Sequence, residues 1–132
     1  MSERIAPEGW DPPRGYSNGV LASGRILAIA GQVGWDERGQ FTSDDFLGQA
    51  AQALRNVATI LRTAGGAPEH LVRMTWYVLD AGEYRANTRA LGKVYREIFG
   101  DFYPAMTLIV VAGLLEPGAR LEIEATAVLP DR

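Results

Sequence analysis

The sequence predicts an α+β protein in which two helices cover one face of a mixed β-sheet. Its 132 residues fit one hydrophobic core, since single domains usually hold roughly 100–200 residues. The spacing of apolar residues changes between period two and period 3.6 in the order β-β-α-β-α-β-β. Two helices are too few to cover both faces of a sheet, so we expect the second face to be covered by self-association.

The N-terminal part predicts an extended lead-in followed by two short strands. Residues 1–15 are rich in proline and glycine and show no periodicity. Short apolar runs follow at 19–22 and 26–30, separated by Ser23-Gly24-Arg25. Two apolar runs around such a short polar gap are typical of a β-hairpin, which we therefore predict here. Residues 35–39 have the composition of a turn.

The clearest helix is predicted from Phe46 to Ala64, where apolar residues recur at i, i+4, i+7 and i+8. Ser43 or Thr42 can accept hydrogen bonds from the first free N–H groups of this helix. Gly65-Gly66 predicts a left-handed stop at its end.

The second half of the chain predicts a strand, a helix and two further strands. Residues 71–79 alternate as in a strand with one buried face, and residues 83–99 return to helical spacing before Gly100. Runs at 106–112 and 121–128 are typical of strands and are separated by a turn with Pro and Gly. No repeat or linker divides the chain, so we expect a single domain over residues 1–132.

Composition excludes several classes of function. The chain has no cysteine, which excludes disulfides, thiolate nucleophiles and cysteine-bound zinc, and favours a cytoplasmic location. The net charge is −3 and no basic stripe is present, so nucleic acid is not an expected partner. No apolar run reaches the ~20 residues that span a bilayer, and no export signal is visible. His70 is the only histidine, so it has no partners for a metal site or triad, and we expect it to be a structural or surface residue.

Two groups of polar residues are candidates for chemistry. Tyr16 and Ser17 precede the first predicted strand, where they can equally satisfy the backbone of a turn. Glu122 and Glu124 alternate with apolar residues and share one face of the last strand. They form either a solvated face or, beside an apolar cleft, a carboxylate that acts as an acid or a base.

Five segments in succession resemble signatures of the RidA/YjgF family. They are Arg14-Gly15-Tyr16-Ser17-Asn18-Gly19-Val20, Ala30-Gly31-Gln32-Val33-Gly34, Gln52-Ala53-Leu54-Arg55-Asn56-Val57, Pro104-Ala105-Met106 and Leu121-Glu122-Ile123-Glu124-Ala125. The resemblance implies a chorismate-mutase-like fold, a homotrimer and clefts between the subunits. It also implies hydrolysis of reactive imines or enamines to a 2-oxo acid and ammonia, with no metal or organic cofactor.

The resemblance assigns roles to particular residues. Glu124 matches the glutamate that orients the attacking water, and Tyr16 matches a tyrosine of the cleft. In the family an arginine that binds the substrate carboxylate follows Pro-Ala, and here that position is Met106. Charge-assisted hydrogen bonds contribute about 1.5–3 kcal/mol each, so this loss removes the main anchor for a carboxylate. The residues expected to bind substrate are Arg14, Ser17, Gly31, Gln32, Trp35, Met106 and Leu108.

Three hypotheses about function follow from the sequence and the resemblance. The first is an imine or enamine hydrolase with an altered substrate preference, in which Arg14 supplies replacement charge. The second is a non-catalytic trimer that binds a small molecule in the same cleft, since Met106, Leu108 and Trp35 make that cleft more apolar. The third, an endoribonuclease, ranks last because a histidine pair and a basic groove are missing.

Overall fold

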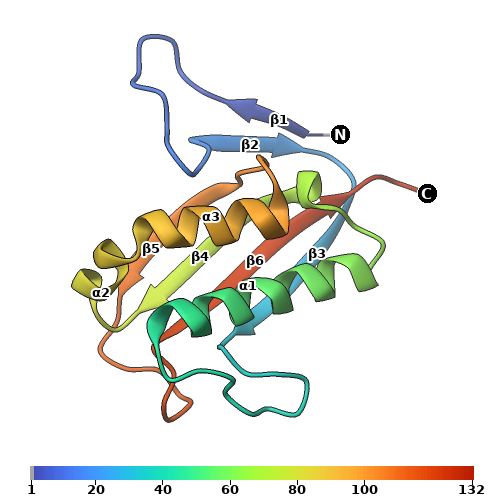
Figure 1. The fold of residues 1–132 in the computed structure, drawn as a ribbon. Helices are drawn as coiled ribbons and strands as arrows, with labels where there is room; N and C mark the ends of the chain where they lie inside the picture. Colours follow the sequence, from blue (N-terminus) through green and yellow to red (C-terminus); the bar gives the residue numbers. More distant parts are fainter. Residues whose placement is uncertain (1) are drawn as a thin grey trace.

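The computed structural model describes residues 2–132 and contains a four-stranded sheet in the order β3-β6-β4-β5. Strand β6 pairs antiparallel with β3 and β4, whereas β5 pairs parallel with β4. The bounds are β3 (Arg25–Gln32), β4 (Leu71–Val78), β5 (Ala105–Val110) and β6 (Leu121–Leu129). The long helices lie side by side across one face of this sheet, which confirms the predicted α+β class (Figure 1).

Three α-helices and one short 3-10 turn connect the strands. They are α1 (Phe46–Thr63), η1 (Pro68–His70), α2 (Ala81–Ala86) and α3 (Thr88–Phe99). The core lies between α1, α3 and the sheet, where Leu54, Met74 and Ile123 are fully buried. Burying one such side chain contributes about 1.5–3 kcal/mol, so this layer supplies the main driving force for folding. No helix within residues 2–132 combines the length and apolar character that crossing a membrane requires.

The predicted β-hairpin is wrong, although both of its strands exist. Strand β2 (Gly19–Ala22) pairs antiparallel with β1 (Ser2–Ile5), a strand inside the predicted lead-in, and the two form a separate sheet. Strand β3 pairs with β6 instead, beginning with Arg25 opposite Leu129. A Cβ atom at Gly24 would lie 2.1 Å from the Leu129 carbonyl oxygen, so glycine lets the chain pass close to the end of β6. Apolar runs therefore identified the strands but not their partners.

The N-cap of α1 is Asp45, and not Ser43 or Thr42 as predicted. The Gly48 N–H donates to the Asp45 side chain at 2.7 Å, and the Ser43 hydroxyl donates to the same carboxylate oxygen at 3.0 Å. A carboxylate at this position accepts the free N–H and also complements the positive end of the helix. The predicted stop is confirmed, since Gly65 adopts a φ of +87° just after the helix.

The helix predicted over residues 83–99 is two helices, because the helical conformation is interrupted at Asn87. Asn87 has φ −111° and ψ 6°, and its side-chain amide donates to the Glu83 carbonyl at 2.8 Å. Asparagine side chains commonly bond to nearby backbone in this way and so interrupt regular helix. Helix α2 begins earlier than predicted because the Asp80 side chain accepts hydrogen bonds from the Gly82 and Glu83 N–H groups.

The second face of the four-stranded sheet carries no helix (Figure 1). We call it the open face, and the opposite side the helix face. Exposed apolar side chains lie on it, with Ile26 76% exposed and Ile109 43% exposed. Charged and polar side chains of β4 and β6 lie beside them. This surface is the one that the sequence predicts to be covered by self-association.

Candidate functional site

A pocket of about 230 Å³ lies on the helix face at the start of β5. Arg14 and Gly15 of the lead-in form one side of it, and Met106 of β5 lies within it. Trp76 of β4, Tyr84 of α2 and Gly92 of α3 contribute to the remaining walls. The structure thus brings together two residues that the sequence analysis expected to bind substrate, Arg14 and Met106. We call this the Met106 pocket.

Ser17 holds the lead-in beside β5. Its N–H donates to the Pro104 carbonyl at 2.9 Å, and its hydroxyl donates to the Tyr103 carbonyl. Residues 17 and 105 form an isolated parallel bridge, which places Arg14 and Gly15 against the edge of the sheet. Ser17 therefore positions the segment that carries Arg14. Tyr16, which lies between Gly15 and Ser17 in the sequence, is 41% exposed.

Trp76 is the most unusual wall of the Met106 pocket. Its side chain is only 4% exposed, and its Nε1 is the single buried side-chain polar atom within residues 2–132 that lacks a hydrogen-bond partner. Leaving a buried donor unsatisfied costs about 1–3 kcal/mol. The indole meets the Tyr84 ring edge to face, with centroids 6.0 Å apart. This geometry gives the pocket a rigid aromatic wall.

The tyrosines around the pocket keep their protons at neutral pH. Burial raises the pKa of Tyr84 and, more strongly, that of Tyr95. The Tyr95 hydroxyl donates to the Phe102 carbonyl at 2.6 Å, and its ring stacks on Tyr103 with centroids 5.0 Å apart. These two contacts join α3 to the loop before β5 beside the pocket.

Glu124 lies on the open face, away from the Met106 pocket. It pairs with Thr75, whereas the neighbouring residue Met74 pairs with Met106, so Glu124 and Met106 point to opposite faces of the sheet. A smaller pocket of about 170 Å³ adjoins Glu124 and also contains Arg73 and Thr75. A site that uses both Glu124 and Met106 thus needs a second copy of the chain.

Tyr77 is a partner of Glu124 that sequence reasoning missed. Its hydroxyl donates to Glu124 Oε2 at 3.0 Å from the adjacent strand. This hydrogen bond to the carboxylate is the main reason that the pKa of Tyr77 is raised above its usual 10.0, since losing the proton would leave two negative groups in contact. The contact holds the Glu124 carboxylate in one orientation on the open face.

The other expected binding residues lie elsewhere in one chain. Gln32 and Trp35 share a pocket of about 280 Å³ with Asn56, whose side-chain amide donates to the Trp35 carbonyl at 2.8 Å. A Cβ atom at Gly31 would lie 2.0 Å from the Glu122 carboxylate, so glycine leaves room for that side chain. Leu108 is half-buried and packs against the core. Of the residues expected to bind substrate, Arg14 therefore shares a pocket within one chain only with Met106.

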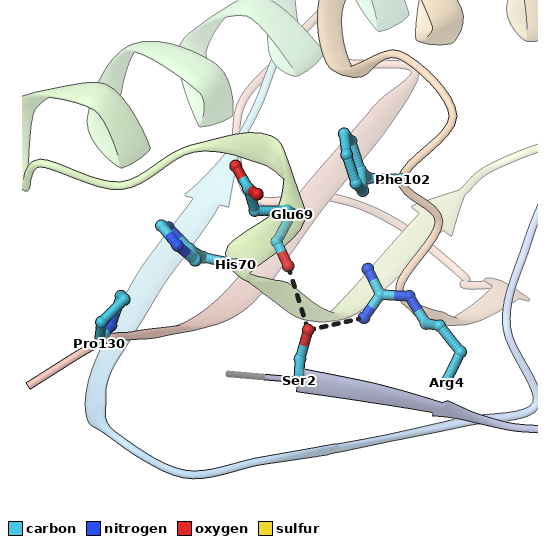
Figure 2. Close-up of a pocket in the computed structure, with 6 residues that line it drawn as sticks. All are labelled: Ser2, Arg4, Glu69, His70, Phe102 and Pro130. Atoms are coloured by element: carbon cyan, nitrogen blue, oxygen red, sulfur yellow. Dashed lines mark hydrogen bonds between the residues drawn. The ribbon is translucent and has the colours of Figure 1, made fainter.

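A further pocket of about 360 Å³ lies between β1 and the turn before β4 (Figure 2). Ser2 donates to the Glu69 carbonyl at 3.4 Å and accepts from Arg4 at 3.5 Å, which are long contacts. The His70 Nδ1 atom accepts from the Ala67 N–H at 2.9 Å, which supports the structural role expected for this residue. None of the residues that line this pocket is one that the sequence analysis expected to be catalytic.

The sequence signal for the missed wall residues was present but unspecific. Trp76 was recognised only as one of the alternating apolar positions of a strand, a pattern that indicates burial and not a pocket. Gly92 lies in the middle of a helix, where sequence alone gives no reason for it. Within residues 2–132, no group of three or more His, Cys, Asp or Glu side chains is placed to hold a metal ion.

Comparison with known proteins places the chain in a family. The family model for Endoribonuclease L-PSP matches residues 7–129. The chain is 36% identical over 114 residues to the human 2-iminobutanoate/2-iminopropanoate deaminase, covering 86% of this chain and 79% of that one. It is 36% identical over 129 residues to the goat protein of the same name, covering 97% and 88% of the two chains.

Solved structures agree with this result. A protein of unknown function from the conserved Rid family of Yersinia pestis, YyfB, is 36% identical, with a TM-score of 0.83 and coverage of 97% and 98%. RidA from the Antarctic bacterium Psychrobacter is 27% identical, with a TM-score of 0.68 and coverage of 96% and 94%. The family model, the sequence matches and the shared fold lead to one conclusion: the chain belongs to the Endoribonuclease L-PSP family, also called RidA/YjgF.

Proposed function

We propose that the chain hydrolyses reactive imines or enamines to oxo compounds and ammonia, with a substrate preference that differs from relatives that keep the family arginine. The observation that carries this proposal is the shared pocket of Arg14 and Met106. Within residues 2–132 Arg14 makes no salt bridge, so its guanidinium is available for a substrate carboxylate. Relatives that are 36% identical are named 2-iminobutanoate/2-iminopropanoate deaminase, which supports the same chemistry.

The proposed catalytic site lies between subunits of a homotrimer. Met106 and Glu124 point to opposite faces of the sheet, so the Met106 pocket of one subunit has to meet the open face of another. The exposed side chains of Ile26 and Ile109 favour such contact, because burying apolar surface is favourable. The same contact would cover the face of the sheet that carries no helix (Figure 1).

In the proposed reaction Glu124 orients a water molecule and takes its proton as the oxygen attacks the C=N carbon. The imine nitrogen takes this proton, which gives a neutral carbinolamine. The hydroxyl proton of the carbinolamine then moves to the nitrogen through Glu124, the C–N bond breaks, and ammonia leaves as the C=O bond forms. The balance is imine plus water giving oxo acid plus ammonia. Tyr16 closes the pocket and donates a hydrogen bond, while Arg14 holds the carboxylate through charge-assisted hydrogen bonds.

The direct test is ammonia release from 2-iminopropanoate generated in place by a dehydrating enzyme. We expect the purified protein to accelerate release, and Glu124→Ala to abolish the acceleration. Glu97→Ala is the matched control, because Glu97 is an exposed carboxylate on α3. A rate equal to that of buffer for the unaltered protein, with this imine and with bulkier ones, would reject the hydrolase proposal.

A second candidate is a trimer that binds a small molecule without transforming it. The apolar walls of the Met106 pocket and the loss of the family arginine favour this function. Binding raises the melting temperature by mass action, so a thermal-shift screen with small carboxylates and neutral analogues tests it. A stabilising ligand that Met106→Arg no longer binds would support this function in a protein that releases no ammonia.

A further inference from the structure

The Met106 pocket is shaped for a bulky side chain. Its walls include the aromatic rings of Trp76, Tyr84 and Tyr95, and the thioether of Met106 contributes an apolar surface in place of a charge. Trp76 and Tyr95 are 4% and 5% exposed, so their rings are fixed by packing. A wall of rigid rings recognises flat apolar groups through stacking and edge-to-face contacts.

Gly92 keeps part of this space empty. It lies inside α3, where glycine costs about 1 kcal/mol relative to alanine. A Cβ atom at this position would meet only the side chain of Arg96, with the nearest atom at 3.3 Å. Backbone crowding therefore does not require glycine here. Its effect on the structure is that position 92 itself adds no side chain to the pocket, which Thr88, Leu91 and Tyr95 line from the same helix.

The volume of the pocket exceeds the needs of the smallest imino acids. Its volume of about 230 Å³ is many times the ~10–15 Å³ that a cavity needs to hold one water molecule. The methyl group of 2-iminopropanoate would leave most of that space unfilled, and unfilled apolar space forfeits dispersion contacts. A phenyl or indole group fills it and reaches the aromatic wall, while Arg14 at the pocket edge remains free for the carboxylate.

We infer that the substrates of this protein are 2-imino acids with large apolar side chains, aromatic ones above all, and that Met106 and Gly92 determine this preference. The inference rests on the proposed hydrolase function and names its substrate class. The reaction consumes one water and releases one ammonia for each 2-oxo acid formed. The supplying reaction must therefore oxidise or dehydrate an amino acid to its imine.

The test compares two imines that differ only in the side chain. A D-amino-acid oxidase generates them from D-alanine and D-phenylalanine, since the imine carbon is trigonal and carries no stereocentre. We expect kcat/KM to be at least about tenfold higher for the aromatic imine, because even a single methylene group in an apolar pocket is worth about 10- to 200-fold. Equal values, or a preference for 2-iminopropanoate, would overturn the inference and leave the hydrolase function intact.

Two variants sharpen the comparison. Met106→Arg fills the pocket and restores a charge. We therefore expect it to lower the ratio of kcat/KM for the aromatic imine to kcat/KM for 2-iminopropanoate by at least about tenfold. Met106→Leu nearly conserves volume and apolar character, and the aromatic preference should survive it. A ratio that Met106→Arg leaves unchanged contradicts the role of Met106.

A binding measurement separates failure of the inference from failure of the proposed function. If neither imine is hydrolysed, calorimetry with the two product acids, 2-oxo-3-phenylpropanoate and 2-oxopropanoate, measures the same pocket. Tighter binding of the phenyl compound by at least about tenfold supports the size preference in a non-catalytic protein. Equal binding, or none, overturns it.

Discussion

The two faces of the central sheet differ in what they offer to a ligand. The helix face holds the Met106 pocket, with aromatic walls and one unpaired cation, Arg14. The open face holds a carboxylate, Glu124, fixed by the Tyr77 hydroxyl at 3.0 Å. The proposed binding groups and the proposed proton-transferring group therefore lie on opposite sides of one layer. The proposed site thus has its two halves on opposite faces of one chain, and only a second copy of the chain can join them.

The largest expected effect comes from preventing the two faces from meeting. Ile26→Glu places a charge on the open face at a side chain that is 76% exposed, so it should leave the fold of one chain intact. We expect loss of the trimer in analytical ultracentrifugation and loss of hydrolysis. Leu115→Glu is the matched control, because Leu115 is 91% exposed in a turn outside the sheet. If the two variants behaved alike in both measurements, the open face would not be the surface through which the subunits meet.

Removing the cation from the helix face should weaken binding without changing the chemical step. Arg14→Ala loses charge-assisted hydrogen bonds worth about 1.5–3 kcal/mol, so KM should rise by roughly 10- to 150-fold while kcat changes little. Steady-state kinetics on the preferred imine checks this, and Arg14→Lys should recover part of the loss. A fall in kcat at unchanged KM would place Arg14 at the reacting atoms instead.

Removing the Tyr77 hydroxyl should have the opposite kinetic signature. Tyr77→Phe frees the Glu124 carboxylate to change orientation, so we expect kcat to fall about three- to tenfold with KM unchanged. Tyr84→Phe offers a contrast from the helix face, where KM should respond first. A Tyr77→Phe enzyme with unaltered kcat would show that this hydrogen bond does not position Glu124.

The same contact predicts a dependence of stability on pH. The pKa of Tyr77 is raised in the folded chain above the 10.0 of the unfolded chain. The contribution of the Tyr77 hydroxyl to the stability of the fold is therefore fully present below pH 10. It is lost as the pH rises through the pKa that Tyr77 has in the folded chain. Glu122 also raises this pKa and Arg73 lowers it. Urea denaturation measures the free energy of unfolding of the unaltered protein and of Tyr77→Phe. The difference between these two free energies should be constant from pH 7 to 9 and should shrink at higher pH.

The smallest effect is expected for Gly92→Ala. Alanine should stabilise α3 by about 1 kcal/mol, since a helical glycine costs that much. The added methyl group narrows the Met106 pocket, so kcat/KM should fall a few-fold for the aromatic imine and remain unchanged for 2-iminopropanoate. Chemical denaturation and the two-imine assay measure these effects separately. A stability gain with no change in substrate preference would remove Gly92 from the specificity argument.

Sequence periodicity predicted the elements better than their connections. Every long strand and α1 appear where the apolar spacing placed them, because burial of one face produces that spacing. The pairing of β2 with β1 was missed because short apolar runs carry no information about register or partner. The break at Asn87 was missed because a side-chain hydrogen bond interrupts a helix without changing its apolar pattern.

The candidate site was predictable only in part. Family motifs identified Glu124, Tyr16 and Met106, and Arg14 was suggested as a replacement charge. The structure supports the proximity of Arg14 to Met106, because Ser17 ties the lead-in to the start of β5. Trp76, Tyr84 and Gly92 come from three separate elements, and only the packing of α2 and α3 on the sheet brings them together.

The attachment of Arg14 to the lead-in has a consequence for how this protein can change over evolution. A cation on a strand cannot be replaced without disturbing the packing of its neighbours, whereas residue 14 is exposed and lies outside the strands and helices of residues 2–132. Substitutions there can exchange, remove or reverse the charge at the pocket edge while β5 and its hydrogen bonds stay as they are. In the proposed site the charge lies on a connecting segment, so substrate specificity can change there independently of stability.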